Sequence, residues 1–328
     1  MTAHVGPQRT RVRLDARGGL EPQAIVANLA AHTVPGAERT DVEASAHERL
    51  VPTARGPVAV RVWFDRDGAE VALGTEDPAA VAAVLASVER WLDLSADLEP
   101  VRRALGGDPD LGPCVRARPA LRVIGTTDPF QTAVTTVLGQ QVSLGAGRTF
   151  AGRLVAAFGT PGPAGLVSFP TAEALADQDT EILRAAVGLT GARARTVSAL
   201  ARAVATAHDS GRQSADSTGA EGSAPAAVPG ILPLGRAELL ALPGIGPWTA
   251  DYLEVRYGHR DAFTPGDLVL RRALGGLSAR EAAERARAWS PFRAYALTHL
   301  WTASAYAVHV PVRPGLGARA SGPGPLPS

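Results

Sequence analysis

The stretch that decides the fold reads Leu242-Pro243-Gly244-Ile245-Gly246-Pro247-Trp248, and it ends in Phe263-Thr264-Pro265-Gly266-Asp267. A helical segment from Arg236 to Ala241 runs into Pro243 and the two glycines. A second helix is expected to begin at Pro247, because proline at the first helical position loses no hydrogen bond. The glycines permit backbone angles that a side chain forbids, and they let another backbone come close. The stretch therefore predicts two short helices joined by a tight turn.

Two short helices joined in this way form a helix-hairpin-helix. The first N–H groups of the second helix lack helical partners and lie at the positive end of its dipole, so they suit an anion such as a DNA phosphate. Gly244 and Gly246 are therefore candidate DNA-binding positions, together with the N–H of Trp248. Taken alone, the Pro-Gly-Ile-Gly turn is also compatible with a simple connector between helices.

The hairpin belongs to a longer pattern of motifs. Leu-Pro-Gly-Ile-Gly, a tryptophan two residues later and the more distant Asp267 resemble the helix-hairpin-helix DNA glycosylases, and within them the AlkA type, DNA-3-methyladenine glycosylase II. Residues 128–143 are similar to the other signature helix of the family, and residues 292–301 to its C-terminal helix. The resemblance covers roughly residues 10–310. It implies an α+β N-terminal sheet module followed by an all-α helix-hairpin-helix glycosylase core.

The patterns along the first part of the chain agree with this division. Apolar residues alternate from Pro57 to Phe64, and the turn sequence at 65–68 predicts a hairpin with the strand that follows. Helical spacing is found at 22–32 and again at 78–92. Together these elements predict an α+β domain at residues 10–98, to which the sequence assigns no chemistry.

The rest of the chain is predicted to be helical, with one interruption. From Glu99 onward the periodicity is helical only, so residues 99–208 and 231–310 are expected to form the all-α core. Residues 209–230 are rich in Ser, Gly, Ala and Pro and have almost no large apolar side chains, so they are predicted to be a disordered insertion. The Pro/Gly-rich residues 311–328 are predicted to be a flexible tail.

Asp267 is the candidate catalytic residue. By resemblance it aligns with the catalytic aspartate of the family, at the start of the helix from Leu268 to Leu274. Cleavage of an N-glycosidic bond builds positive charge on the sugar, which a fixed carboxylate stabilises while it orients or deprotonates the attacking water. An aspartate before an apolar helical run is also a common N-cap, and the two roles are compatible.

Trp248, Tyr252 and Trp301 are the candidate base-binding residues. The first two are four positions apart and share one face of a helix. The resemblance implies that all three surround a flipped-out base, where electron-rich rings favour a cationic alkylated purine through stacking and cation–π attraction. Ordinary core packing is the alternative.

Other candidate contacts to the substrate lie outside the aromatic set. The resemblance places Gln140 near the lesion as a substrate-binding residue, and Gln141 in the gap that the flipped base leaves in the duplex; a solvated helix end is the alternative for both. Arg271, followed by Arg272, is a candidate contact to the DNA backbone, although exposed arginines on a helix are usually only solvated.

The resemblance implies no required cofactor. Family members often hold a monovalent cation, Na⁺ or K⁺, with carbonyl groups of the hairpin. By analogy, the carbonyls in this chain are those of Leu240, Leu242 and Ile245. The histidines show no metal-ligand spacing.

Composition excludes several related chemistries. The 328-residue chain has one cysteine, Cys114, and no lysine, so its 33 basic residues are all arginine. A single cysteine excludes a four-cysteine iron–sulfur site, and the lack of lysine excludes the Schiff-base chemistry by which bifunctional glycosylases cut the strand. The formal net charge is only +1, so any phosphate-binding surface must be local.

These observations predict a monofunctional DNA glycosylase that excises alkylated purines of the 3-methyladenine and 7-methylguanine type in base excision repair. With no apolar run long enough to span a membrane and no signal peptide in the sequence, we expect a cytoplasmic monomer acting on double-stranded DNA with damaged bases. A glycosylase for other damaged bases and a non-catalytic helix-hairpin-helix DNA-binding protein are the alternatives. The latter would need neither Asp267 nor tryptophans that converge on it.

Overall fold

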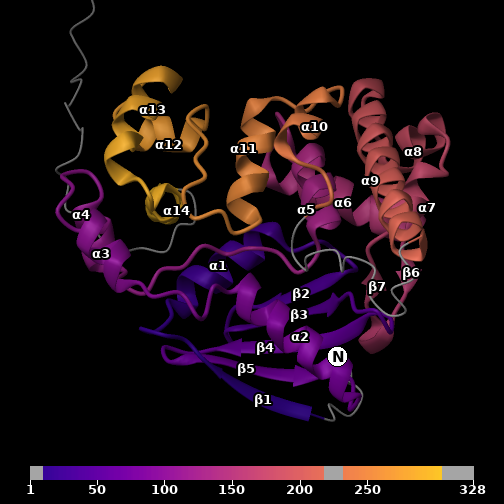
Figure 1. The fold of residues 1–328 in the computed structure, drawn as a ribbon, viewed down its shortest axis with the longest axis horizontal. Coiled ribbons are helices and arrows are strands. Elements are labelled where there is room, and N and C mark those ends of the chain that lie inside the picture. Colours follow the sequence, from indigo (N-terminus) through magenta and orange to yellow (C-terminus); the bar gives the residue numbers. More distant parts are fainter. Residues whose placement is uncertain (1–9, 218–231, 305–328) are drawn as a thin grey trace, which may run out of the picture.

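The computed structural model describes residues 10–217 and 232–304, which form a sheet-based N-terminal part and a helical remainder (Figure 1). The N-terminal part is an antiparallel sheet of five strands in the order β1-β5-β4-β3-β2. The strands are β1 (Thr10–Asp15), β2 (Glu38–Asp41), β3 (Ala46–Val51), β4 (Val58–Phe64) and β5 (Gly68–Leu73). Helices α1 (Pro22–His32) and α2 (Pro78–Trp91) pack with the sheet in one apolar cluster. The predicted fold class is confirmed.

Side chains alternate between buried and partly exposed along β4, the central strand of the sheet. Every second residue of β4 is buried, beginning with Val58, and those between are partly exposed. Val62 of β4 pairs with Val71 of β5, and both side chains are buried in the cluster under the two helices. The hairpin predicted from this alternation is confirmed.

The sequence did not predict β2 and β3. All six residues of β3 are buried, including His47, Glu48 and Arg49, so this strand shows no alternation of apolar and polar residues. Glu48 accepts a hydrogen bond from Arg39 of β2 at 2.8 Å, and Arg49 approaches Glu38 of β2 at 3.2 Å. Partners on the neighbouring strand therefore stabilise charges whose burial would otherwise be costly.

The helical remainder contains the elements that hold the candidate site. Its helices are α3 (Glu99–Leu105), α4 (Gly112–Ala117), α5 (Pro129–Gly139), α6 (Leu144–Phe158), α7 (Ala172–Ala176), α8 (Thr180–Val187), α9 (Gly191–Ser217), α10 (Arg236–Ala241), α11 (Pro247–Arg256), α12 (Leu268–Ala273), α13 (Ala279–Ala286) and α14 (Arg293–Ser304). The paired strands β6 (Thr160–Pro161) and β7 (Val167–Ser168) correct the expectation of helices only.

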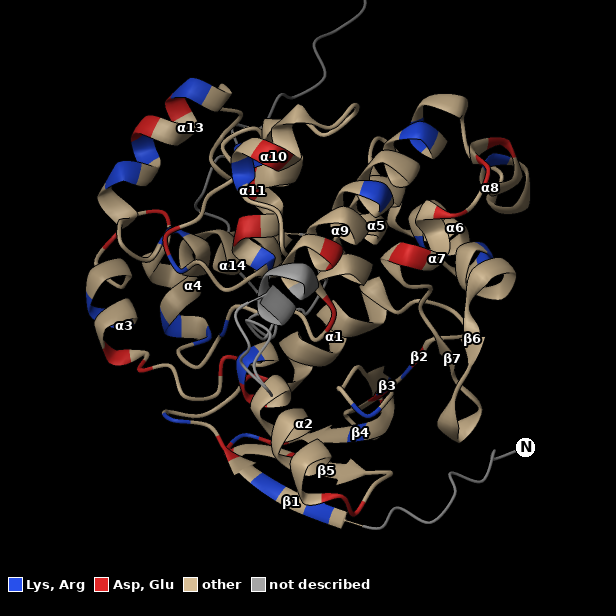
Figure 2. Ribbon diagram, turned by 45° about the vertical axis from the view of Figure 1, so that its right-hand side comes forward, with Lys and Arg blue, Asp and Glu red and all other residues tan. Residues whose placement is uncertain are grey.

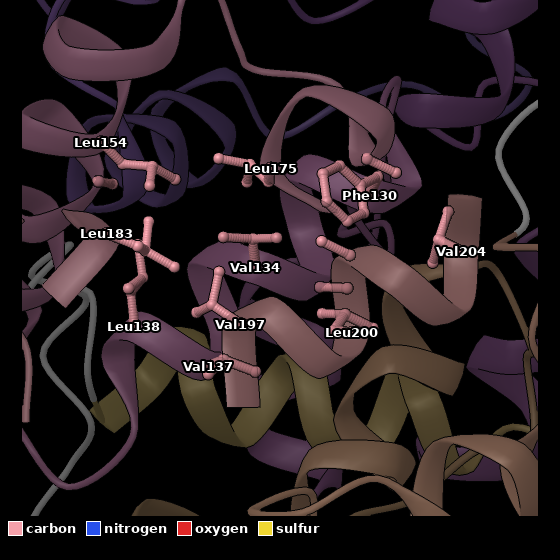
Figure 3. Packing of buried hydrophobic residues seen from close by; sticks show 14 of the residues in the cluster. Phe130, Val134, Val137, Leu138, Leu154, Leu175, Leu183, Val197, Leu200 and Val204 are labelled. Carbon is pink, nitrogen blue, oxygen red and sulfur yellow. The ribbon is translucent and has the colours of Figure 1, made fainter. Parts of the chain in front are cut away.

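Two apolar clusters organise these helices, and α11 belongs to both. Side chains of α5, α6, α7, α8 and α9 form the cluster drawn in Figure 3, in which Val134 and Leu200 are fully buried. Leu253 of α11 packs into this cluster, whereas Val255 packs into the second one, with α12 and α14. The second helix of the hairpin therefore lies at the junction of the two cores, which fixes its position firmly.

The predicted disordered insertion at 209–230 is wrong for its first part, because α9 continues to Ser217. The apolar face of α9, with Val197 and Val204, is anchored in the core. Each further residue of an established helix adds a backbone hydrogen bond at small entropic cost, and residues 209–217 contain no proline to stop it. Residues 218–230 and the predicted tail at 311–328 lie outside the described residues.

Charges are mixed over the elements that the structure describes. Figure 2 shows acidic and basic residues side by side on α13, for example. Within residues 10–217 and 232–304, no helix combines the length and the apolar character needed to cross a membrane.

Candidate functional site

The hairpin between α10 and α11 has the geometry that its glycines predicted. Gly244 has a φ of +81°, and a Cβ there would lie 2.2 Å from Oγ1 of Thr196 on α9. Gly246 has an ordinary φ of −95° and caps α11, and a Cβ there would meet nothing within 4 Å. Ile245 between them is buried in the core. The turn is thus held against α9 while both glycines remain exposed, as phosphate binding requires.

Asp267 lies at the start of α12 and is almost entirely buried, with 8% of its surface exposed. Its Oδ1 accepts a hydrogen bond from the backbone N–H of Leu270 at 2.8 Å, which is an N-cap. The same oxygen accepts from Nε1 of Trp301 at 3.0 Å, and Oδ2 accepts from Nε1 of Trp248 at 3.3 Å. The N-cap is therefore compatible with the predicted catalytic role, since the carboxylate that caps α12 also accepts hydrogen bonds from two indoles.

The three candidate aromatic residues form one continuous group. The rings of Trp248 and Tyr252 are stacked, with 5.3 Å between centroids and an interplanar angle of 14°. Tyr252 and Trp301 follow at 5.8 Å with their planes tilted by 50°. Arg256 donates a hydrogen bond to the Tyr252 hydroxyl at 2.9 Å. All three rings are only partly buried, and Trp301 also packs against the second apolar core.

A cavity of about 300 Å³ opens in front of this group, and Asp267 and all three aromatic residues line it. Its volume lies in the range of small-molecule pockets and exceeds that of a single purine base. Other walls come from α5 and α6, and a further wall comes from the N-terminal part, where Asn28, His32 and Arg49 contribute. The arrangement can hold a planar ring between aromatic faces, next to a fixed negative charge.

The sequence did not predict the wall from the N-terminal part, a domain to which it assigned no chemistry. The signals that were available were an asparagine within the apolar helical run 24–31 and a polar triplet, residues 47–49, inside a β-strand. Neither signal belongs to a motif, and only the packing of the two parts of the chain brings Asn28 and Arg49 to the cavity that Asp267 lines.

This polar wall is organised around a buried carboxylate. Glu38 accepts a hydrogen bond from Nε2 of Gln131 on α5 at 2.6 Å and lies 3.2 Å from Arg49. Burial raises the pKa of Glu38, but the charge of Arg49 and the hydrogen bonds from Val34 N–H and Gln131 together outweigh it, so the pKa lies below its ordinary value. Burial, assisted by the positive charge of Arg256, lowers the pKa of His32 to about 4. His32 is therefore neutral at physiological pH.

Gln140 contacts the hairpin, and its predicted position near the lesion stays a prediction. Its side-chain amide donates to the carbonyl of Gly244 at 3.1 Å and to Oγ1 of Thr249 at 2.9 Å, and it does not line the cavity. The residue holds the end of α5 against the hairpin because its long side chain spans the gap between these two elements. Gln141 follows, exposed and with a φ of +55°, at the tip of the turn between α5 and α6.

The remaining candidates lie around the hairpin and α12. Nε of Arg271 donates to the carbonyl of Leu277 at 2.6 Å, so its guanidinium braces the loop after α12. The carbonyl of Leu242 accepts from the N–H of Ile245 at 3.3 Å. The cation contacts predicted for Leu240, Leu242 and Ile245, and the DNA contact of Arg271, stay predictions.

Known families match both parts of the chain. Residues 11–128 match the AlkA N-terminal domain, and residues 134–289 match the HhH-GPD superfamily base excision DNA repair protein. The chain is 36% identical over 300 residues to the "Probable bifunctional transcriptional activator/DNA repair enzyme AlkA" of Mycobacterium tuberculosis (strain H37Rv). That match covers 89% of this chain and 56% of the relative, so the chain spans little more than half the length of that protein.

A second relative is matched over most of its length. DNA-3-methyladenine glycosylase 2 of Escherichia coli (strain K12) is 30% identical over 276 residues, which cover 83% of this chain and 90% of the relative. Among solved structures, a 3-methyladenine DNA-glycosylase from Archaeoglobus fulgidus has a TM-score of 0.71 at 20% identity, covering 91% of this chain and 100% of that one. A Clostridium acetobutylicum 8-oxoguanine glycosylase/lyase bound to double-stranded DNA has a TM-score of 0.64 at 13% identity, covering 89% and 97%.

The two structural likenesses show a shared fold, whereas the sequence matches over both parts show common descent. With a relative that is 30% identical and matched over 90% of its length, the chain belongs to the AlkA family of helix-hairpin-helix DNA glycosylases.

Proposed function

We propose that this protein is a monofunctional DNA glycosylase that hydrolyses the N-glycosidic bond of alkylated purines, of the 3-methyladenine and 7-methylguanine type, in double-stranded DNA. The observation that carries the proposal is the position of Asp267. Its carboxylate is fixed by Trp248, Trp301 and the helix start, at the wall of a cavity large enough for a purine.

The chemistry follows from this placement. As the bond to the base lengthens, positive charge develops on the sugar, and a carboxylate held by three donors stabilises it without reorganisation. The same carboxylate orients a water molecule that attacks the sugar. An alkylated purine is already cationic and leaves without strong acid catalysis, so one carboxylate suffices.

The aromatic group supports a cationic base as substrate. The stacked faces of Trp248 and Tyr252, with Trp301 beside them, offer electron-rich surfaces to a positively charged ring. The chain has no lysine, so a Schiff base with the sugar and subsequent strand cleavage are not available to it. We therefore infer that the product is an abasic site in an uncut strand.

DNA binding is assigned to the exposed hairpin turn. Gly244 and Gly246 are exposed, so their backbone N–H groups can reach a phosphate, and exposed Gln141 lies at the tip where a residue could enter the gap left by the base. The active form that we propose is a monomer.

A monovalent cation at the hairpin is part of the proposal. The carbonyl of Leu240 belongs to the last turn of α10, where carbonyls lack helical partners, and the carbonyls of Leu242 and Ile245 follow in the turn. These oxygens fit a hard cation such as K⁺. DNA affinity measured in K⁺ and in tetramethylammonium at equal ionic strength tests this; equal affinities would exclude the site.

The function is tested with duplex DNA that carries one 7-methylguanine, under single-turnover conditions. Wild type is expected to release the base and leave an intact strand that alkali then cuts. Asp267→Asn keeps a good N-cap and is expected to bind the duplex but to lose release by at least about 100-fold.

The matched control is Asp179→Asn, since Asp179 caps α8 outside the cavity and is expected to leave release unchanged. Binding without release by wild type would instead support a non-catalytic DNA-binding protein. Release of oxidised bases only would support a glycosylase for other lesions.

A further inference from the structure

Helix α6 turns one face toward the cavity, and this face runs from solvent into the core. Its cavity-lining residues recur at the helical spacing of three and four positions: Leu144, Gly147, Arg148 and Ala151. Leu144, at the start of the helix, is 53% exposed, and Arg148, about one turn later, is also exposed, whereas Ala151 is buried. Leu144 and Arg148 therefore form a rim where the cavity opens to solvent.

The end of α5 connects this rim to the exposed hairpin. A Cβ at Gly147 would lie 3.2 Å from Cα of Gly139, so the second turn of α6 packs directly on the last residue of α5. The next residue, Gln140, donates to the carbonyl of Gly244 in the hairpin at 3.1 Å. Since each step is a direct contact, the rim and the hairpin are close enough for one duplex to reach both.

Arg148 differs from the other arginines that line the cavity in the described part of the chain. Arg49 is buried and pairs with Glu38, and Arg256 donates to a hydroxyl of the aromatic group. Nε of Arg148 donates to the carbonyl of Thr33, at the end of α1, across 3.1 Å. Within the described residues its terminal nitrogens have no hydrogen-bond partner and no carboxylate forms an ion pair with it. The guanidinium is thus held at the rim with its outer N–H groups available.

A phosphate is the ligand that suits this arrangement. A guanidinium binds a phosphate through paired N–H groups. Base, sugar and phosphate are joined in that order, so a nucleotide whose base lies in the cavity has its phosphates at the opening. The positive charge of Arg148 would otherwise oppose the entry of a cationic base, and a bound phosphate neutralises that charge.

We propose that Arg148 is a DNA-binding residue that contacts a phosphate of the damaged strand next to the flipped nucleotide. This inference rests on the proposed function and adds a second phosphate contact to the hairpin. The hairpin holds the duplex, and Arg148 holds the damaged strand where its base leaves the stack.

The test measures affinity for a duplex with one tetrahydrofuran residue, a stable abasic-site analogue, over a range of salt concentrations. Arg148→Gln removes the charge and is expected to weaken binding about tenfold at low salt. The slope of log affinity against log salt should become less steep by about 0.9, the value for one phosphate. Arg148→Lys keeps the charge and should keep the slope. If Arg148 served only to tie α6 to Thr33, the slope would stay unchanged in Arg148→Gln, and this result would overturn the proposal.

Uncharged methylphosphonate linkages locate the contact. One phosphate at a time is replaced on either side of the tetrahydrofuran, and wild type is expected to lose affinity at a position where Arg148→Gln loses none. Arg202→Gln is the matched control, since Arg202 is an exposed arginine on α9 that does not line the cavity, and it should respond as wild type does. Equal losses in wild type and Arg148→Gln at every position would overturn the assignment.

Release of 7-methylguanine by wild type tests the proposed function separately. If wild type binds the analogue but releases no base, the proposed function fails. If wild type releases the base while Arg148→Gln keeps the wild-type slope, only the contact of Arg148 fails.

Discussion

Nε1 of Trp301 donates a hydrogen bond to Oδ1 of Asp267 across 3.0 Å, although the two residues are 34 positions apart in the chain. The indole comes from α14, whose residues Tyr295 and Leu297 are buried in the core with α12. The packing of α14 therefore holds the indole N–H of Trp301 in place. A carboxylate that receives a fixed donor on one oxygen keeps its orientation when the base and the water approach.

Removing this donor without removing the ring is expected to slow base release. Trp301→Phe keeps an aromatic face for the base but loses the N–H, and hydrogen bonds to charged groups contribute about 1.5–3 kcal/mol, so release should fall roughly 10- to 100-fold. Single-turnover release and duplex affinity measure the effect, and affinity should change little. The matched control is Trp289→Phe, which removes an indole bond to Asp108 outside the cavity. Equal loss of activity in both variants would contradict the prediction.

Asp267 is expected to affect stability and activity separately. Asn can accept the hydrogen bond from Leu270 N–H as a cap, whereas Ala cannot. Asp267→Ala should therefore lower the free energy of unfolding by about 1 kcal/mol, and Asp267→Asn by less, while both lose base release. Urea unfolding beside the release assay measures the two effects. An Asn variant that is as unstable as the Ala variant would show that the cap contributes little.

Hairpin and strand signals made much of this fold predictable. The glycines and prolines of residues 242–247 specify the turn through local sterics, and Val58 to Phe64 specify a strand through side-chain alternation, so both could be read directly. Strand β3 could not, because its buried Glu48 and Arg49 break the pattern and depend on partners in β2. Side-chain alternation does not predict a strand whose charged residues are buried against oppositely charged residues of a neighbouring strand.

The candidate site likewise contains residues that the sequence predicts and residues that it does not. Asp267, Trp248 and Trp301 are near motifs that the sequence displays, and the structure brings them together. Asn28 lies in an apolar helix of the other part of the chain, and its nearness to the cavity follows only from how the two parts pack. Gln140 lies in a motif too, but its amide reaches the hairpin instead of the cavity, which sequence spacing does not reveal.

Gly244 and Gly246 are expected to differ sharply although they are two residues apart. Gly244→Ala places a Cβ against Thr196 at a positive φ, which should cost about 1–3 kcal/mol of stability and weaken duplex binding. Gly246→Ala meets open space at an ordinary φ and should cost less than about 1 kcal/mol. Thermal unfolding and duplex affinity test the pair. Equal costs would mean that contact with α9 does not fix the turn.

Gln140 is expected to support DNA binding and not base selection. Gln140→Ala loses the bonds to Gly244 and Thr249 that tie the end of α5 to the hairpin, so duplex affinity should fall roughly 3- to 10-fold, as for one or two ordinary hydrogen bonds. The ratio of 3-methyladenine to 7-methylguanine released should stay constant. Gln178→Ala, which loses a single exposed bond to Ala174, is the control. A change in this ratio in Gln140→Ala would show that Gln140 contributes to base selection.

Acid is expected to destabilise the protein through its buried histidines. Burial lowers the pKa of His299 to about 4, with a smaller contribution from the Arg118 charge, and burial also lowers the pKa of His47 to about 4. The unfolded chain binds these protons near pH 6.5, so stability is full above that pH and falls as the pH drops from 6.5 to 4.

Each buried histidine steepens the fall by up to about 1.4 kcal/mol per pH unit. Urea midpoints between pH 7.5 and 4.5 should therefore fall less steeply for His299→Leu than for wild type. An unchanged slope for His299→Leu would show that acid unfolding begins elsewhere, at carboxylates such as Glu38 whose ion pair with Arg49 is lost when it is protonated.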